Sequence, residues 1–245
     1  MAIEEIIHCR CDGNGLTLDR PDEELAAHIR AGSVLVVPAW QAEQVLAYRR
    51  LARQWMAGRP PLDHGSSASI PAISFHRRDD EHCPTIIPHV FHQAALCHGT
   101  HDDPVLWAMT MTLIGALLAL QNRLAGTDFQ LSDPTLKVKI ICHPVGGGHF
   151  ACHVHPLEPM GVAFFLGLAR PGSDFQDGGL FIEHFGRRTD LQQYLAPGNA
   201  VFFRYDLPHG VAAVDADTPR DWSGNTGVWL ASVELTTSYP ASRMV

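Results

Sequence analysis

Residues 143–156 have the sequence His143-Pro-Val-Gly-Gly-Gly-His-Phe-Ala-Cys-His-Val-His-Pro156. The three glycines predict a turn, and residues 150–155 after them predict a short β-strand. Alternate residues of a strand point to the same face, so the imidazoles of His153 and His155 are expected on one face, about 6–7 Å apart along the strand. Neutral imidazole is the commonest metal ligand in proteins. This stretch therefore predicts a strand that presents two candidate metal ligands.

Further β-rich segments lie on both sides of this strand. They cover residues 136–142, 161–168, 179–183, 200–205 and 228–237. Several short strands at such spacing, separated by turn residues, predict an antiparallel sandwich or barrel. His209 follows the 200–205 segment, 56 residues after His153. Two ligands from one strand and a third from a distant strand would form a facial metal triad, whose opposite side stays open for oxygen and substrate.

The first half of the chain has a helical pattern. We expect amphipathic helices at residues 19–32 and 41–56, with a buried strand at 33–39 between them. Residues 104–120 carry no charge, which approaches the lower limit for a membrane span. The charges that flank this segment and its internal threonines favour a buried helix packed on the outside of the barrel. Residues 58–103 show no period and are expected to form irregular loops over the site.

The composition limits the classes of protein to which the chain can belong. The chain has 245 residues, of which 46% are hydrophobic and 18% charged, which is enough to bury a sizeable core. The formal net charge of −8 argues against nucleic acid or an anionic membrane as a partner. Six cysteines form no CxxC pair and no secretory signal opens the chain, so we expect reduced thiols and a cytoplasmic protein. Among fifteen histidines, His153, His155 and His209 have the spacing of ligands.

Several segments, in this order, resemble the Fe(II)/2-oxoglutarate-dependent oxygenases of the phytanoyl-CoA or prolyl hydroxylase type. They are residues 143–156, Gly178-Gly-Leu-Phe-Ile182, Pro197-Gly-Asn-Ala-Val-Phe-Phe203 and Pro208-His-Gly-Val211. The resemblance covers residues 136–237 well and residues 32–57 loosely. It implies one mainly β domain over residues 1–245. Its core would be a double-stranded β-helix (jelly-roll) of about eight strands at 128–240, with an N-terminal helical part, 1–125, packed outside.

The resemblance also assigns the metal ligands. His153 matches the first histidine of the family's His-x-Asp/Glu pair, and His209 matches its distal histidine. His155 stands where the family has a carboxylate, which makes the ligand set neutral. Three-histidine iron sites occur in cupin-like dioxygenases that need no 2-oxoglutarate, so His155 is compatible with a metal. Glu158, on the turn beyond the strand, is the alternative source of a carboxylate.

A second departure concerns the cosubstrate. The family usually places an arginine on the strand after the distal histidine, where it pairs with a carboxylate of 2-oxoglutarate. Residues 227–236 contain no basic side chain. Lys139, on the strand before the glycine turn, and Arg220, on the loop before the last strand, are the candidates to replace it, and Lys139 is preferred.

Three hypotheses follow. The first is a mononuclear non-haem iron oxygenase that uses Fe(II), oxygen and 2-oxoglutarate to act on a small molecule. The second is a dioxygenase of the same fold that needs no 2-oxoglutarate and binds its substrate directly on a three-histidine metal. The third is a non-catalytic protein that binds a metal or a ligand in the barrel. We expect neither nucleic acid nor a membrane as a partner, and the sequence assigns no substrate or oligomeric state.

Overall fold

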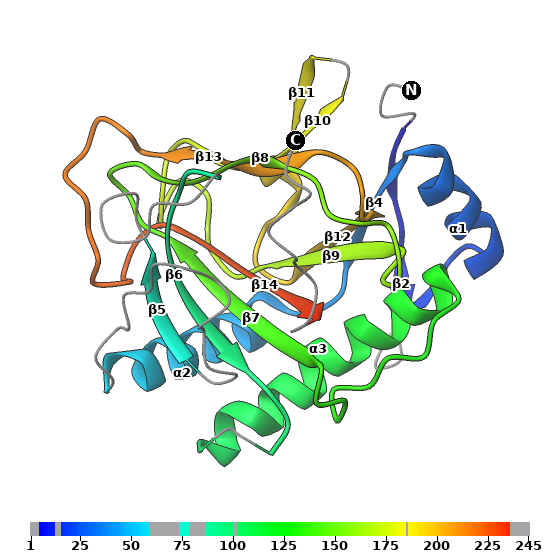
Figure 1. Cartoon of the computed structure of the whole chain (residues 1–245), viewed down its shortest axis with the longest axis horizontal. Coiled ribbons are helices and arrows are strands. Elements are labelled where there is room, and N and C mark those ends of the chain that lie inside the picture. Colours follow the sequence, from blue (N-terminus) through cyan, green and yellow to red (C-terminus); the bar gives the residue numbers. More distant parts are fainter. Residues whose placement is uncertain are drawn as a thin grey trace.

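Eight short strands follow one another between Leu136 and Leu235 in the computed structural model of the chain (Figure 1). They are β7 (Leu136–His143), β8 (Gly148–His153), β9 (Val162–Gly167), β10 (Gly179–His184), β11 (Arg187–Asp190), β12 (Asn199–Arg204), β13 (His209–Val214) and β14 (Val228–Leu235). The structure describes residues 5–12, 16–58, 74–78, 87–99, 102–184 and 186–235. The six predicted strands of this half are confirmed, whereas β11 and β13 were not predicted.

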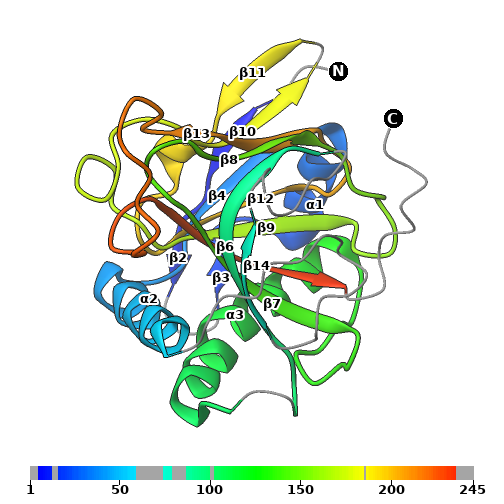
Figure 2. The same ribbon diagram turned by 60° about the vertical axis from the view of Figure 1, so that its left-hand side comes forward.

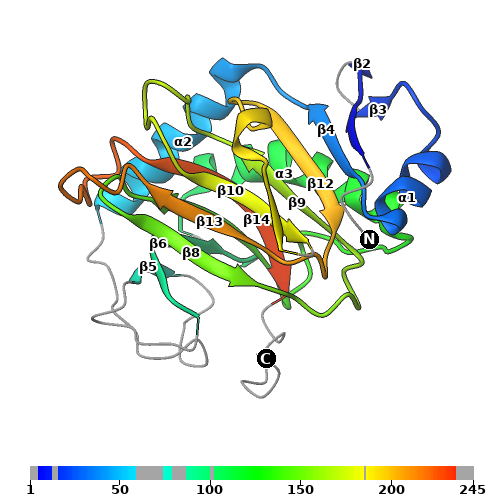
Figure 3. The ribbon, with the colours of Figure 1, turned by 90° about the horizontal axis from the view of Figure 1, so that it is seen from above.

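Consecutive strands alternate between two antiparallel sheets. The first sheet has the order β12-β9-β14-β7, and the second has the order β8-β13-β10-β11. Among these eight strands, β10 and β11 alone follow one another within one sheet. Figures 1 and 3 show β8, β10 and β13 as a layer that lies over β7, β9 and β14. The two sheets therefore enclose an interior between them.

The N-terminal part contributes strands as well as helices. The strand β4 (Val34–Pro38) pairs antiparallel with β12, and β1 (Ile6–His8) pairs parallel with β4, so both extend the first sheet. A small separate ribbon is formed by β2 (Cys11–Asp12) and β3 (Thr17–Leu18). The predicted strand at 33–39 is confirmed.

The prediction of irregular loops at 58–103 is wrong for the part that the structure describes. There the chain forms β5 (Ser74–Arg78) and β6 (His89–Leu96). The first half of β6 pairs with β8 and its second half with β7, so β6 joins the two sheets. All eight residues of β6 are buried, and for this reason its sequence shows no alternation of polar and apolar side chains. Residues 59–73, 79–86 and 100–101, which belong to the same predicted loop region, lie outside the described residues.

Capping residues account for several of the helix ends. They are α1 (Asp22–Ala31), α2 (Ala42–Ala57) and α3 (Pro104–Ala125), with a short 3-10 turn, η3, at Gln192–Tyr194. The Asp103 carboxylate accepts hydrogen bonds from the first backbone N–H groups of α3. Gly32 and Gly126 end α1 and α3 in the left-handed conformation, with φ of 105° and 72°.

The apolar helix α3 packs against β9 and β14 of the first sheet and against the other two helices (Figure 2). By length and composition it is long and apolar enough to cross a membrane, and 44% of its most apolar window is buried inside the protein. Its buried side chains, such as Leu113 and Leu117, belong to the main hydrophobic core. The helix therefore packs as part of the core of the protein.

The two faces of the first sheet have different neighbours. On the helix side, the Arg49 guanidinium of α2 lies over the Trp229 ring of β14, 5.4 Å from its centroid. Register and alternation then place Lys139, which is opposite Ser232 of β14, on the other face, toward the second sheet. Lys137, opposite Glu234, shares that face. The interior between the sheets therefore contains charged side chains from the first sheet.

Candidate metal centre

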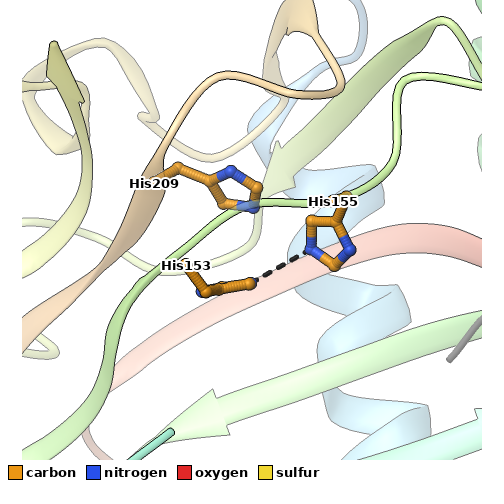
Figure 4. Close-up of side chains that lie close together, drawn as sticks. All are labelled: His153, His155 and His209. Atoms are coloured by element: carbon orange, nitrogen blue, oxygen red, sulfur yellow. Dashed lines mark hydrogen bonds between the residues drawn. The ribbon is translucent and has the colours of Figure 1, made fainter. Parts of the chain in front are cut away.

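The three predicted ligands come together at one end of the second sheet (Figure 4). His153 is the last residue of β8 and His209 is the first residue of β13, and the two are paired directly across the strands. His155 lies two residues beyond the end of β8, which begins and ends two residues earlier than predicted. The following residue is Pro156, which favours an extended backbone at His155. The alternation of side chains therefore continues past the strand, and His155 still points toward His153.

The ligand atoms of the three histidines lie within 4.8 Å of one another. Nε2 of His153 is 3.0 Å from Nε2 of His155. Two nitrogen ligands that bind one ion at about 2.1 Å and at a right angle would lie about 3.0 Å apart. The ring centroid of His209 is 4.6 Å from that of His153 and 5.1 Å from that of His155. This geometry fits three imidazoles on one face of a single ion.

Backbone carbonyls orient two of the three rings. Nδ1 of His153 is 3.0 Å from the carbonyl oxygen of Ala151, and Nδ1 of His209 is 2.7 Å from that of Leu207. A carbonyl oxygen only accepts, so Nδ1 donates in both cases and Nε2 carries the lone pair. Metal-binding histidines are commonly held in this way through the nitrogen that does not bind the ion. The donor set therefore matches that of a divalent transition-metal site.

Aromatic side chains pack on each imidazole. The Phe150 ring stacks on His153 at 4.2 Å between centroids, and the Tyr205 ring stacks on His155 at 4.7 Å. The Phe203 ring meets His209 edge-on at 5.3 Å. These contacts restrict the orientation of the three ligands and keep their surroundings apolar.

Burial keeps the three imidazoles neutral. It lowers the pKa of His153 to about 4 and that of His209 to about 3, from an ordinary value of 6.5. Burial and the two neighbouring histidines lower the pKa of His155 further. Removal of the ring from water disfavours the charged form of histidine. All three lone pairs are thus available to a cation at neutral pH.

A charged cluster lies in the same interior. Lys139 and Lys137 each contact Oε2 of Glu234, at 3.2 Å and 3.1 Å between the charged atoms. Burial alone would raise the pKa of Glu234, but the two lysines lower it to about 2, so this carboxylate is ionised. Lys139 was predicted as a site residue and does lie in the interior. Glu234 was missed, although a single acidic residue in the apolar run 228–235 was a signal for it.

The two other predicted site residues lie elsewhere. Arg220 is exposed on the loop between β13 and β14, where its Nε donates to the Gly146 carbonyl at 3.3 Å and its guanidinium lies over the Trp222 ring. Glu158 is exposed on the turn after β8, and the group of convergent ligands in the described part of the chain consists of the three histidines. Neither side chain is placed among the ligands.

No protein-family model and no curated protein matches the chain. Solved structures are similar to it. One is a prolyl-4-hydroxylase from Pseudomonas putida, at 12% identity and a TM-score of 0.58, over 87% of this chain and 98% of that chain. A second is the non-haem α-ketoglutarate-dependent epimerase SnoN from nogalamycin biosynthesis, at 20% identity and a TM-score of 0.51, over 91% and 86%. A third is a prolyl hydroxylase from Trichoplax adhaerens in complex with a peptide fragment of hypoxia inducible factor, at 11% identity and a TM-score of 0.54, over 86% and 87%.

At these identities the similarity shows the fold alone. The chain has the fold of Fe(II)/2-oxoglutarate oxygenases, as its sequence resemblance implied.

Proposed function

We propose that this chain is a mononuclear non-haem iron oxygenase that acts on a small molecule, with Fe(II) held by His153, His155 and His209 and with 2-oxoglutarate as cosubstrate. The observation that carries this proposal is the convergence of three neutral, oriented imidazoles within 4.8 Å, inside a fold that resembles 2-oxoglutarate oxygenases. Bound iron would supply the activation of oxygen. The remaining roles belong to side chains of this chain.

We infer further that the strands β7 to β14 form a double-stranded β-helix. The alternation of successive strands between two antiparallel sheets supports this inference. In such a core the ends of β8 and β13 meet, and the ligands His153 and His209 lie there. The helices α1 to α3 would then cover the outer face of the first sheet.

The side chains around the histidines have distinct roles in this proposal. The three Nε2 atoms hold the metal on one side and leave the other side for ligands. Phe150, Phe203 and Tyr205 keep water from the imidazole faces. Lys139, whose charge contributes to the lowered pKa of all three histidines, would bind the carboxylate of 2-oxoglutarate that is remote from the metal.

A second candidate function has specific support. His155, beside His153, stands where the resembled family has its carboxylate ligand. Glu234 pairs with Lys139, the side chain that would otherwise bind 2-oxoglutarate. Both features favour a dioxygenase that needs no 2-oxoglutarate and binds its substrate directly on the three-histidine metal.

Oxygen uptake by the iron-loaded protein, measured with and without 2-oxoglutarate, tests these functions. Uptake and succinate formation that require 2-oxoglutarate support the first function. Oxygen uptake that is stimulated by members of a library of small acids and phenols, and that does not change when 2-oxoglutarate is added, supports the second function. If the protein binds one metal ion per chain but takes up no oxygen under either condition, both oxygenase functions are contradicted. The remaining hypothesis is then a non-catalytic binding protein.

The variant His155→Asp refines this test. If His155 is a ligand, an aspartate at this position retains the metal and adds a negative charge, so turnover changes while metal content stays at one ion per chain. His155→Ala loses the metal. If Glu158 is the third ligand instead, both variants at His155 keep wild-type metal content and turnover, and Glu158→Ala loses them.

A further inference from the structure

The hydroxyl of Tyr205 is a buried polar group without a hydrogen-bond partner. The residue is only 8% exposed, and none of the described residues donates a hydrogen bond to its hydroxyl or accepts one from it. A buried tyrosine hydroxyl usually has such a partner, because an unpaired one costs free energy. Tyr48, the other buried tyrosine among the described residues, pairs with the Thr110 hydroxyl at 3.0 Å. The unpaired hydroxyl of Tyr205 therefore requires a separate explanation.

The position of the backbone and the contacts of the ring direct this hydroxyl toward the candidate metal ligands. Tyr205 directly follows β12 of the first sheet, and its backbone N–H donates to the Gly161 carbonyl at 3.1 Å. Its ring stacks on His155, which follows β8 of the second sheet, at 4.7 Å between centroids and an angle of 20°. The ring therefore crosses the interior between the two sheets. Because the hydroxyl is the end of the side chain farthest from the backbone, it lies in this interior, beside the histidines.

The neighbours of Tyr205 on this side leave its hydroxyl without an acceptor in the described structure. Phe203, two residues earlier on the same face, has no polar atom in its side chain and contacts His209 edge-on at 5.3 Å. Nδ1 of His209 and of His153 donates to a backbone carbonyl, and both residues belong to the candidate ligand group. Burial, together with the charge of Glu234, raises the pKa of the Tyr205 hydroxyl, so this group is protonated at neutral pH and able to donate.

The ligand set itself favours an anion next to this donor. Three neutral imidazoles bring no negative charge and leave both charges of a divalent ion uncompensated. They also occupy one side of the ion, so that the opposite side is open to further ligands. An anion bound there keeps lone pairs on its atoms that do not touch the metal. A hydroxyl forms a charge-assisted hydrogen bond with such an atom, and bonds of this kind are stronger than those between neutral groups.

We propose that the Tyr205 hydroxyl donates a hydrogen bond to an oxygen or nitrogen anion bound at the metal, and that it favours anions that keep a free lone pair there. This inference rests on the proposed function for the metal ion itself. The ring and the hydroxyl then have separate roles. The ring restrains the ligand His155, whereas the hydroxyl binds the anion.

Azide binding to the Co(II)-loaded full-length protein, followed by the visible absorption of the cobalt, tests the inference. Azide is a singly charged anion whose far nitrogen remains an acceptor after the other end binds a metal. Tyr205→Phe keeps the ring, so we expect it to bind Co(II) as tightly as wild type but azide about tenfold more weakly, the range of one charge-assisted hydrogen bond. Tyr48→Phe is the matched control. It removes a buried hydroxyl that pairs with Thr110, between α2 and α3, and should leave both affinities unchanged.

A neutral probe separates the loss of a hydrogen bond from a general change in the site. 1-Methylimidazole has neither a donor nor an acceptor left once its free ring nitrogen binds a metal. Its affinity for the Co(II) protein should therefore be the same in wild type and in Tyr205→Phe. Tyr205→Leu also removes the ring that stacks on His155, and it should weaken Co(II) binding itself. A purely structural role of Tyr205 would not lower the affinity for azide while the affinity for Co(II) stays unchanged.

2-Oxoglutarate, as a third probe, distinguishes the two sources of the anion. A loss of its affinity in Tyr205→Phe that parallels the loss for azide assigns the hydroxyl to the cosubstrate, and an unchanged affinity assigns it to an anionic substrate.

Three results would overturn the inference while the metal centre stands. The first is azide binding to Tyr205→Phe that is as tight as to wild type. The second is an equal loss of 1-methylimidazole affinity, or a loss of Co(II) affinity as large as in Tyr205→Leu. The third is a Co(II)-loaded wild type that binds no azide. A wild type that binds no Co(II) would instead contradict the proposed metal centre, and the inference with it.

Discussion

Acidification should destabilise the metal-free protein well before its carboxylates titrate. Burial lowers the pKa of four histidines from 6.5: to about 3 for His143, about 4 for His153, about 3 for His209 and further still for His155, where two neighbouring histidines add to burial. Below pH 6.5 the unfolded chain binds protons at these positions, and the folded protein does not. The folded state is therefore fully favoured above pH 6.5 and loses stability as the pH falls toward 4.

The size of this effect follows from the number of groups. Each histidine contributes up to about 1.4 kcal/mol per pH unit to the free energy of unfolding. Four of them should reduce that free energy by about 4 kcal/mol between pH 6.5 and pH 5.5. Domains are typically stable by about 5–15 kcal/mol, so the metal-free protein should approach its unfolding midpoint between about pH 5 and pH 4. Glu234, whose pKa is about 2, adds its own loss only below its ordinary value of 4.5.

Urea unfolding of the metal-stripped protein at pH 7.5, 6.5 and 5.5 measures this slope. Zn(II)-loaded protein is the first control, because protons must then displace the metal from His153, His155 and His209, and the loss should begin at lower pH. His143→Leu is the second control. His143 lies outside the ligand group, and its removal should reduce the slope by about a quarter. An unfolding free energy that stays constant from pH 7.5 to pH 5.5 would refute the assignment of neutral, buried histidines.

Three other substitutions have expected outcomes. Both amide atoms of Gln121 are buried without a hydrogen-bond partner in the described structure. Gln121→Leu should therefore raise the free energy of unfolding by about 1–2 kcal/mol in urea titrations. A decrease in this free energy would show that the amide group stabilises the fold. Gly198 has φ of 97° and an added Cβ would meet the Trp40 carbonyl oxygen, so Gly198→Ala should lower the melting temperature, by roughly 2 kcal/mol or more in free energy. Tyr205→Leu, which removes the ring stacked on His155, should weaken metal binding about 10–100-fold in competition titrations, whereas Tyr205→Phe should retain it.

The sequence was most informative where one face of a strand is polar and the other apolar. Lys137 and Lys139 alternate with apolar residues on β7, and Lys139 was a candidate site residue because the family resemblance requires a basic side chain near the metal. The ligand set was also accessible, because His153 and His155 are two residues apart and His209 follows a strand. Alternation along the strand predicted that His153 and His155 share one face.

Strands without a run of β-branched or aromatic residues escaped prediction. β6 is buried throughout, and β13 consists largely of small residues with weak strand preference, His-Gly-Val-Ala-Ala-Val. The partner of Lys139 was likewise out of reach, since the register that brings Glu234 to the lysines joins strands almost a hundred residues apart. Pairing across a sheet depends on tertiary contacts that local patterns do not encode.

The central claim is that His153, His155 and His209 hold one metal ion. Anaerobic calorimetric titration of the metal-free protein with Fe(II) tests it most directly, in wild type beside His155→Ala and Glu158→Ala. We predict one ion per chain in wild type and in Glu158→Ala, and loss of binding in His155→Ala. Full stoichiometry and affinity in His155→Ala, with loss in Glu158→Ala, would contradict the three-histidine centre.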